Sequence, residues 1–322
     1  MSVRLSIQIV TWNSGEDLKA CLESLATQTC SDFEVIVLDN ASADGSADRA
    51  EKMIPSKLDG RVLRESTNRG FCGGHNHALK ASSGEWVLFL NPDAILPPDF
   101  VQQAILIVDR ADPDVGSICP RILLHDGRLD SAGLTVDRFR RVYDRGHGEA
   151  AAGRYEIEED VEGCTGAVVL HRRAMLEDIA IRGEVLDEGL FAYYDDIDLS
   201  WRARLYGWRS RYVPNLRAIH RRSGRNALRK RATDAPRTAQ QMLMVRNRFL
   251  VMTKCERAID LVKGLPWLLP FEAARLLFLV VRAPGALRGY LGAASMLPTA
   301  LRNRRVIQAT AAQRQSRGSA DS

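Results

Sequence analysis

Short apolar runs alternate with amphipathic stretches through the first two thirds of this chain of 322 residues. The clearest run is Trp86–Leu90, which includes aromatic and β-branched residues. Such a run is typical of a strand buried on both faces of a mostly parallel sheet. Pro92 cannot donate a ladder hydrogen bond, so we expect the strand to end before it. This places Asp93 just beyond the carboxyl end of a central strand.

The rest of this region repeats the same alternation. Leu18, Cys21, Leu22 and Leu25 recur at helical spacing, and similar patterns predict helices that end near residues 80, 108 and 179. Strands are predicted over 6–10, 33–38, 61–64, 115–119, 167–170, 208–213 and 218–220. We expect Pro214 to end the strand before it. Alternating strands and helices predict an α/β fold with a doubly wound, mostly parallel sheet and right-handed crossovers.

Polar residues follow the ends of the predicted strands, where open α/β sheets bind their ligands. Trp12 could stack on a base, and Asp39 could accept a hydrogen bond from a base N–H or a ribose hydroxyl. Asp93 could hold Mg²⁺ or Mn²⁺ beside a substrate diphosphate. Read singly, Trp12 is equally a core residue and Asp39 and Asp93 are equally turn formers. His220 alone is more typical of a core or surface histidine than of a metal ligand.

A glycine-rich loop, 68–74, precedes the helix predicted to end at Lys80. Gly70, Gly73 and Gly74 would let the backbone approach a phosphate at the helix N-terminus. The spacing matches neither the dinucleotide-binding fingerprint nor a phosphate-binding loop with its lysine. The lack of that loop argues against a nucleoside triphosphatase.

Three aspartates, Asp195, Asp196 and Asp198, stand where a helix to Tyr206 is predicted to begin. Acidic residues are favoured in the first turn of a helix. Like charges at short range raise one another's pKa, which suits a general base that works near neutral pH. A solvated acidic helix start is the simpler alternative.

The composition changes after Ser223. Arginines crowd 202–257 within a formal net charge of +5, and the run at 225–231 is strongly basic. Arg221 and Arg222 could clamp a diphosphate, meet acidic lipid head groups or form a solvated basic face. The apolar stretch 261–281 is interrupted by Lys263, two prolines, Glu272 and Arg275, which makes it a poor membrane span.

We expect this C-terminal region to contain interfacial helices that lie in an anionic bilayer surface. A helical hairpin packed on the catalytic domain is the alternative. The expected domains are therefore a catalytic domain over 1–224, a helical, membrane-associating region over 225–301 and a disordered tail over 302–322.

The six cysteines are scattered, without a Cys-x-x-Cys pair. We expect reduced thiols that fill the core in a reducing compartment, and no zinc site. The first twelve residues carry one charge and a strand-like pattern, which does not match a signal peptide.

Taken in order, these segments resemble glycosyltransferase family 2, in particular its rhamnosyltransferase-like branch, which builds bacterial cell-surface glycans. The resemblance extends from about Ser6 to Arg222, and the ordered series is more specific than any one motif. The segments that carry it are 9–14, 33–42, 68–76, 87–93, 194–199 and 208–214, with His220.

The resemblance implies a GT-A fold and an inverting transfer from a nucleoside-diphosphate sugar. Asp39 would contact the base, Asp93 and His220 would bind a divalent metal (Mg²⁺ or Mn²⁺), and Asp196 would be the catalytic base. The expected substrate-binding residues are Thr11, Trp12, Asn13, Asp39, Asn68, Gly70, Gly73, Gly74, Asn91, Asp195 and Arg222.

Two positions depart from the family pattern. Asn91 replaces the first carboxylate of the usual Asp-x-Asp, which leaves fewer carboxylates for a metal and makes Asn91 a ribose contact instead. His75 replaces an asparagine, and the sequence offers no reason for it. The Gln-x-x-Arg-Trp signature of processive synthases is absent from the sequence, so we expect single additions.

The expected activity is that of a non-processive hexosyltransferase, using dTDP-rhamnose or a UDP-sugar and a hydroxyl of a glycan or lipid-linked acceptor in cell-surface polysaccharide synthesis. We expect a cytoplasmic protein, peripheral on the inner face of the cell membrane, with no nucleic-acid partner. A nucleotidyltransferase is one alternative, although 11–15 lacks the basic, glycine-rich loop expected after its first strand. A non-enzymatic protein that binds nucleic acid or anionic membrane is another.

Overall fold

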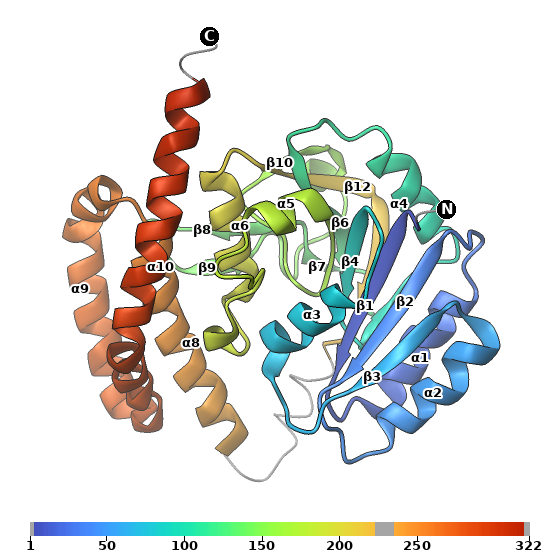
Figure 1. Ribbon diagram of the computed structural model, residues 1–322. Coiled ribbons are helices and arrows are strands. Elements are labelled where there is room, and N and C mark those ends of the chain that lie inside the picture. The colour runs from blue at the N-terminus through green and yellow to red at the C-terminus, as the bar shows by residue number, and fades with distance from the viewer. Residues whose placement is uncertain (1–2, 223–234, 319–322) are drawn as a thin grey trace.

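A ten-stranded sheet, in the order β10-β12-β6-β11-β4-β1-β2-β3, forms the centre of the computed structural model, which describes residues 3–222 and 235–318 (Figure 1). Two short strands extend it, since β5 pairs with β12 and β7 pairs with β6. The strands are β1 (Leu5–Thr11), β2 (Phe33–Asp39), β3 (Gly60–Arg64), β4 (Trp86–Leu90), β5 (Ala94–Ile95), β6 (Val115–Leu123), β7 (Leu129–Ser131), β10 (Glu159–Val161), β11 (Val168–Arg172) and β12 (Arg209–His220). A separate hairpin pairs β8 (Leu134–Val136) with β9 (Val142–Asp144).

The sheet is mixed but mostly parallel, as expected. β4, β1, β2 and β3 pair in parallel. β11 lies antiparallel between β4 and β6, and β12 again runs parallel to β6. The carboxyl ends of β1, β2 and β4 therefore lie next to one another at one edge, where the sequence places its candidate ligands.

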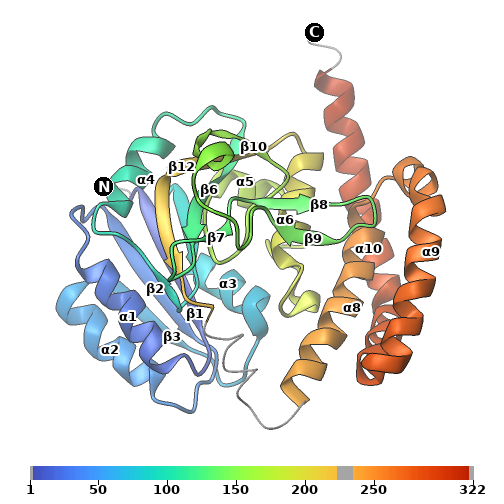
Figure 2. The same cartoon turned by 180° about the vertical axis from the view of Figure 1, so that it is seen from behind.

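Helices cover both faces of this sheet. They are α1 (Gly15–Ala26), α2 (Ser46–Lys57), α3 (Gly70–Lys80), α4 (Phe100–Val108), α5 (Arg173–Asp178), α6 (Asp195–Leu205), α8 (Ala235–Cys255), α9 (Ala258–Arg282) and α10 (Arg288–Gly318). Side chains of α1, α2 and α4 share one apolar core with alternate residues of the strands. Those of α5, α6, α8 and α10 share the core on the opposite face. Figure 2 shows α8, α9 and α10 beside α6, away from α1 and α2.

Two features of the C-terminal half correct the sequence analysis. The chain from Arg302 is not disordered as far as the structure describes it, because α10 continues to Gly318 and buries Ile307 and Ala311. Pro214 does not end a strand, because β12 continues through it to His220. The register of β12 on β6 shifts between Val213 and Arg217, and such a bulge accommodates a proline that cannot donate. The basic run predicted at 225–231 lies outside the described residues.

Candidate active site

Thr11 and Asp39 end neighbouring strands and face each other in the register of β1 and β2. Both side chains are buried, with 0% and 3% exposure. The Asp39 Oδ2 accepts a hydrogen bond from the Ser42 amide at 3.0 Å, whereas Thr11 Oγ1 and Asp39 Oδ1 have no partner within the described chain. Buried polar atoms are normally paired. Two adjacent unpaired atoms at this edge therefore suit a polar ligand such as a nucleoside.

The loop after β1 completes this corner. Trp12 is 55% exposed, which excludes the alternative of a core residue and leaves its ring available for stacking. Asn13 instead braces two loops, because its Oδ1 accepts from the Ala43 amide at 2.8 Å and its amide donates to Ser42 Oγ at 2.9 Å. Asn13 has a left-handed backbone, with φ of 52°, a conformation that asparagine adopts more readily than most residues.

The glycines of the 68–74 loop have a packing role that the sequence analysis did not predict. A Cβ on Gly70 would lie 2.3 Å from the Phe191 carbonyl oxygen, and one on Gly74 would lie 2.6 Å from Val10. Gly73 is similarly close to the Arg69 side chain. These contacts show that the glycines let α3 approach the sheet and the 191 loop.

The amides at the start of α3 are also partly used within the chain. The Gly70 amide donates to Asn68 Oδ1 at 2.8 Å, and the Cys72 amide donates to the Phe191 carbonyl at 3.1 Å. Asn40, which sequence reasoning missed, donates to the Gly70 carbonyl at 2.8 Å. Asn68 and the glycines therefore shape the loop from within, and their contact with a phosphate stays a prediction.

A continuous series of ionic contacts begins at Asp93 beyond β4. The His220 Nε2 lies 3.0 Å from Asp93 Oδ1, and His220 Nδ1 lies 2.7 Å from Asp130 Oδ2. Arg222 then donates from Nε to Asp130 and from Nη2 to Asp144. Arg222 is thus engaged with two carboxylates rather than directed at a diphosphate. The series joins residues from β12, β7 and β9 with the end of β4.

The charges in this series shift one another's pKa. Burial would lower the pKa of His220, but its hydrogen bonds to Asp130 and Asp93 and their charges raise that pKa to about 9. Burial would raise the pKa of Asp130, but His220 and Arg222 lower it. These charged partners favour a role for His220 in a charged site over that of an ordinary core residue.

Asp93 and His220 fit a divalent metal as part of its ligand set. Metal-binding histidines commonly hydrogen-bond a carboxylate through their second ring nitrogen, as His220 does with Asp130. Within the described residues, no group of three or more His, Cys, Asp or Glu is arranged to hold a metal ion. The two residues would therefore need further oxygen ligands, which a substrate diphosphate supplies. Asn91 lies close by, with its Nδ2 3.5 Å from His220 Nε2.

Asp195 and Asp196 begin α6 on the other side of this series. Burial and the Asp196 charge raise the pKa of Asp195 to about 8. Burial and the Asp144 charge raise the pKa of Asp196 to about 6, against hydrogen bonds from the Ile197 and Gly166 amides. The pair therefore holds a proton up to a higher pH than isolated aspartates do. Asp144, whose charge acts on Asp196, also accepts a hydrogen bond from Arg222 at the end of the series that contains the predicted metal ligands.

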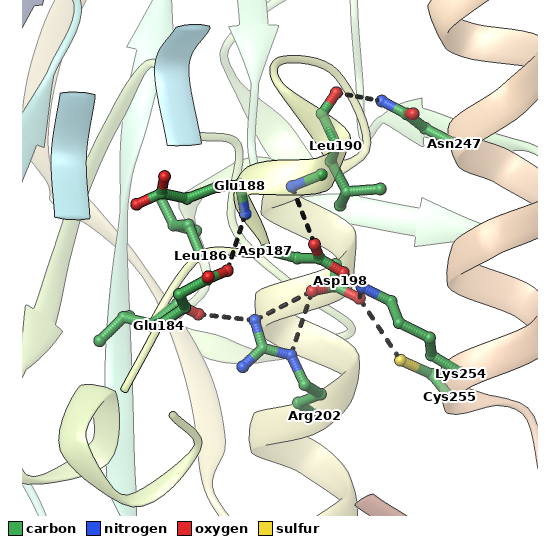
Figure 3. Close-up of polar contacts among 12 residues, drawn as sticks. Glu184, Leu186, Asp187, Glu188, Leu190, Asp198, Arg202, Asn247, Lys254 and Cys255 are labelled. Carbon is green, nitrogen blue, oxygen red and sulfur yellow. Dashed lines mark hydrogen bonds and ion pairs between the residues drawn. The ribbon is translucent and has the colours of Figure 1, made fainter. Parts of the chain in front are cut away.

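Asp198 differs from its two neighbours. It is buried and pairs with Arg202 at 2.9 Å and with Lys254 of α8 at 2.8 Å (Figure 3). Burial would raise the pKa of Asp198, but these two cations lower it. The acidic cluster therefore divides into a candidate catalytic pair, Asp195 and Asp196, and Asp198, which anchors α8. This corrects the expectation that all three aspartates raise one another's pKa.

The structure also explains His75. Its ring stacks on Phe89 with centroids 4.1 Å apart and contacts Phe71 at 4.3 Å. Its Nδ1 lies 3.2 Å from Gln8 Oε1. Burial lowers the pKa of His75 to about 3, with a smaller effect of His171. His75 is therefore a neutral core residue.

Sequence reasoning missed Asp130 and Asp144, which lie in the irregular stretch between β6 and β11. The sequence analysis predicted no strand or helix in this stretch. No periodicity marks either residue, and their partners are distant along the chain: His220 lies 90 residues from Asp130, and Arg222 lies 78 residues from Asp144. Their charged, glycine-rich surroundings were the only available signal.

Comparison with known proteins agrees with this geometry. A family model described as Glycosyl transferase family 2 matches residues 6–179. An uncharacterized protein, y4gI of Sinorhizobium fredii, is 28% identical over 230 residues, which cover 68% of this chain and 24% of that protein. A PGL/p-HBAD biosynthesis glycosyltransferase of Mycobacterium bovis is 36% identical over 88 residues, covering 27% of this chain and 34% of that protein. The matches thus span about a quarter to a third of these relatives.

Two solved structures share the fold over nearly the whole chain. The mannosyltransferase PcManGT from Pyrobaculum calidifontis, in complex with GDP-Man and Mn²⁺, is 21% identical with a TM-score of 0.57, covering 98% of this chain and 88% of that one. S. aureus TarS 1–349 with UDP-GlcNAc is 19% identical with a TM-score of 0.58, covering 97% and 88%. These similarities confirm the GT-A fold with its C-terminal helical region.

Proposed function

This chain belongs to glycosyl transferase family 2 and is a glycosyltransferase, and from that premise we propose an inverting, non-processive transfer to a hydroxyl of a glycan or lipid-linked acceptor. The donor is a nucleoside-diphosphate sugar, either dTDP-rhamnose or a UDP-sugar, and the product is part of a cell-surface polysaccharide. The observation that best supports the proposal is the series of contacts from Asp93 and His220 to Asp144, whose charge raises the pKa of Asp196.

Asp196 removes the proton from the acceptor hydroxyl. The hydroxyl oxygen then forms a bond to the anomeric carbon as the bond from that carbon to the leaving phosphate oxygen breaks on the opposite face, which inverts the centre. The proton remains on Asp196, and the nucleoside diphosphate leaves. Asp195 lies beside the base, and burial and the Asp196 charge raise its pKa as well.

The chain's other residues bind the donor. Asp39 Oδ1 accepts a hydrogen bond from the nucleoside, and the Thr11 hydroxyl donates or accepts another. The exposed Trp12 stacks near the base. Asp93 and His220 would hold a divalent metal, which when bound neutralises the charge that grows on the leaving phosphates. Asp130 fixes the orientation of the His220 ring for this role.

Hydrolysis of a panel of donors tests the proposal. The purified protein with Mn²⁺ would be incubated with dTDP-rhamnose, UDP-glucose, UDP-N-acetylglucosamine and GDP-mannose, and release of each nucleoside diphosphate would be measured. We expect slow release from one donor, because water can replace the acceptor at Asp196. Release of nucleoside diphosphate from none of them, with no binding of the parent diphosphates, would contradict the proposed donor class.

We also propose that α9 attaches the protein to an anionic membrane surface. Within the described residues, α9 is the one helix long and apolar enough to cross a bilayer by length and composition. Only Gly264, Leu268 and Leu279 of α9 are buried. Its exposed large apolar side chains are Ile259, Leu261, Val262, Leu265, Trp267, Leu269, Leu276, Leu277, Phe278, Val280 and Val281. Lys263 and Arg282 add positive charge to this apolar surface, which complements acidic lipid head groups.

Sedimentation with vesicles tests this attachment. The protein is expected to pellet with vesicles of phosphatidylcholine and phosphatidylglycerol, and less as salt screens the charges. Replacing both Leu277 and Phe278 with Glu should weaken binding by about tenfold or more, because burying each side chain contributes about 1.5–3 kcal/mol. Leu106→Glu, on α4 of the catalytic domain, is the matched control and should bind normally. Protein that stays in the supernatant with anionic vesicles would contradict the membrane proposal alone.

A further inference from the structure

The backbone that leads into the catalytic pair is strained. Residues 186–194, which we call the base loop, end directly at Asp195. Phe191, Tyr193 and Tyr194 all have left-handed backbones, with φ of 66°, 70° and 65°. Aromatic residues rarely adopt this conformation, which costs about 1–3 kcal/mol each and persists only where surrounding contacts impose it. The base loop therefore needs partners that hold its shape.

Helix α8 supplies those partners from outside the sheet. The side chain of Asn247 is fully buried, and its Nδ2 donates to the carbonyls of Leu190 at 2.9 Å, Ala192 at 2.9 Å and Tyr193 at 2.8 Å. The adjacent Arg246 donates from Nη2 to the carbonyls of Gly189 and Leu190. Figure 3 shows Asn247 reaching from α8 to Leu190.

The opposite side of the base loop is held by α3. The Asn76 Nδ2 donates to the Leu186 carbonyl at 2.7 Å, and the Leu186 amide returns a bond to Asn76 Oδ1 at 2.9 Å. The Cys72 amide donates to the Phe191 carbonyl. Asn247 differs from these residues because one side chain binds three carbonyls of the base loop. Two of them flank Phe191, and the third directly precedes Tyr194. An amide group has two hydrogens, so the three oxygens share them.

We propose that Asn247 is a positioning residue of the reaction: by gathering the carbonyls of the base loop, it fixes the direction in which Asp196 meets the acceptor hydroxyl. This rests on the proposed role of Asp196 as the base. Helix α8 is then part of the catalytic unit, although sequence analysis placed it in a separate helical region. The side chain of Asn247 bonds to the base loop and to Arg246. Thr11 and Asp39 are not among its partners in the described residues, so we expect donor binding to be independent of it.

Asn247→Leu keeps the branching of the side chain at Cγ and removes both amide hydrogens. With the panel donor that turns over fastest, kcat is expected to fall about 100-fold, the usual cost of a misplacement near 1 Å. The donor KM and the affinity for UDP, GDP or dTDP with Mn²⁺ should change less than about threefold. Asn303→Leu is the matched control, since Asn303 is also a buried asparagine of the helical region but lies on α10. It should keep its kcat.

Asn247→Ser retains one donor and keeps the test decisive if the leucine variant does not fold. Its kcat is expected to lie between those of the leucine variant and the unaltered protein. A normal kcat in either folded variant, or a parallel loss of kcat and nucleotide affinity, would overturn the positioning role. Asp196→Asn separates the two proposals: if it stays active, the base assignment fails, whereas an inactive Asp196→Asn with an active Asn247→Leu overturns only the role of Asn247.

Discussion

Asp196→Asn is expected to lower kcat by about 10²–10⁴-fold, the usual contribution of a general base, while leaving the affinity for the nucleoside diphosphate unchanged. Asparagine keeps the size of the side chain and its place at the start of α6, but it cannot take the proton from the acceptor. Turnover and nucleotide titration, measured on the same preparation, check the loss of kcat and the unchanged affinity. Asp126→Asn, at an exposed turn, is the matched control and should behave as the unaltered protein.

The pH profile sharpens this expectation. Since burial and the Asp144 charge raise the pKa of Asp196 to about 6, the base is ionised above that pH and protonated below it. We expect kcat/KM to fall about tenfold for each pH unit below 6 as the base form is lost. The residual activity of Asp196→Asn should lack this acid limb. An Asn variant with normal turnover, or with the same acid limb, would contradict the assignment of Asp196.

Asp93→Ala is expected to weaken nucleoside-diphosphate binding in the presence of Mn²⁺ and to reduce kcat/KM by about 10³-fold, since metal stabilisation of leaving phosphates is worth several kcal/mol. Without metal, the variant and the unaltered protein should bind the nucleotide equally weakly. Calorimetric titrations with UDP, GDP and dTDP, with Mn²⁺ and then with EDTA, measure this difference. Asp99→Ala, on the same segment but exposed, should bind normally. Equal affinities with and without Mn²⁺ in both proteins would argue against a metal at Asp93.

The parts of the fold that follow local rules were predictable. Trp86–Leu90 matches β4 residue for residue, because a buried parallel strand needs an uninterrupted apolar run. The strand-edge position of Asp39 and Asp93 follows from the same alternation. Pro214 shows the limit of such reasoning, because the pairing of β12 with β6 extends beyond the local effect of one proline.

The contacts between distant segments were not predictable. Asp130, Asp144 and Asn247 act through partners that only the tertiary fold brings together. Asp130 and Asp144 lie in a stretch without a clear period, and the helical pattern around Asn247 does not show what that helix contacts. The tail from Arg302 has a polar composition typical of disorder, yet Ile307 and Ala311 are buried in the core that α8 shares. The packing role of the glycines in the 68–74 loop was not predictable for a related reason, since a close approach to the chain itself and one to a phosphate require the same residue type.

Crystals grown with Mn²⁺ and a nucleoside diphosphate provide the most direct test, because the anomalous signal locates the manganese without reference to any assumed site. We predict a manganese peak bound by Asp93 and His220, with the diphosphate oxygens completing its ligands and the base beside Asp39 and Trp12. A nucleotide bound away from the carboxyl ends of β1, β2 and β4, or a manganese peak that touches neither Asp93 nor His220, would contradict the account.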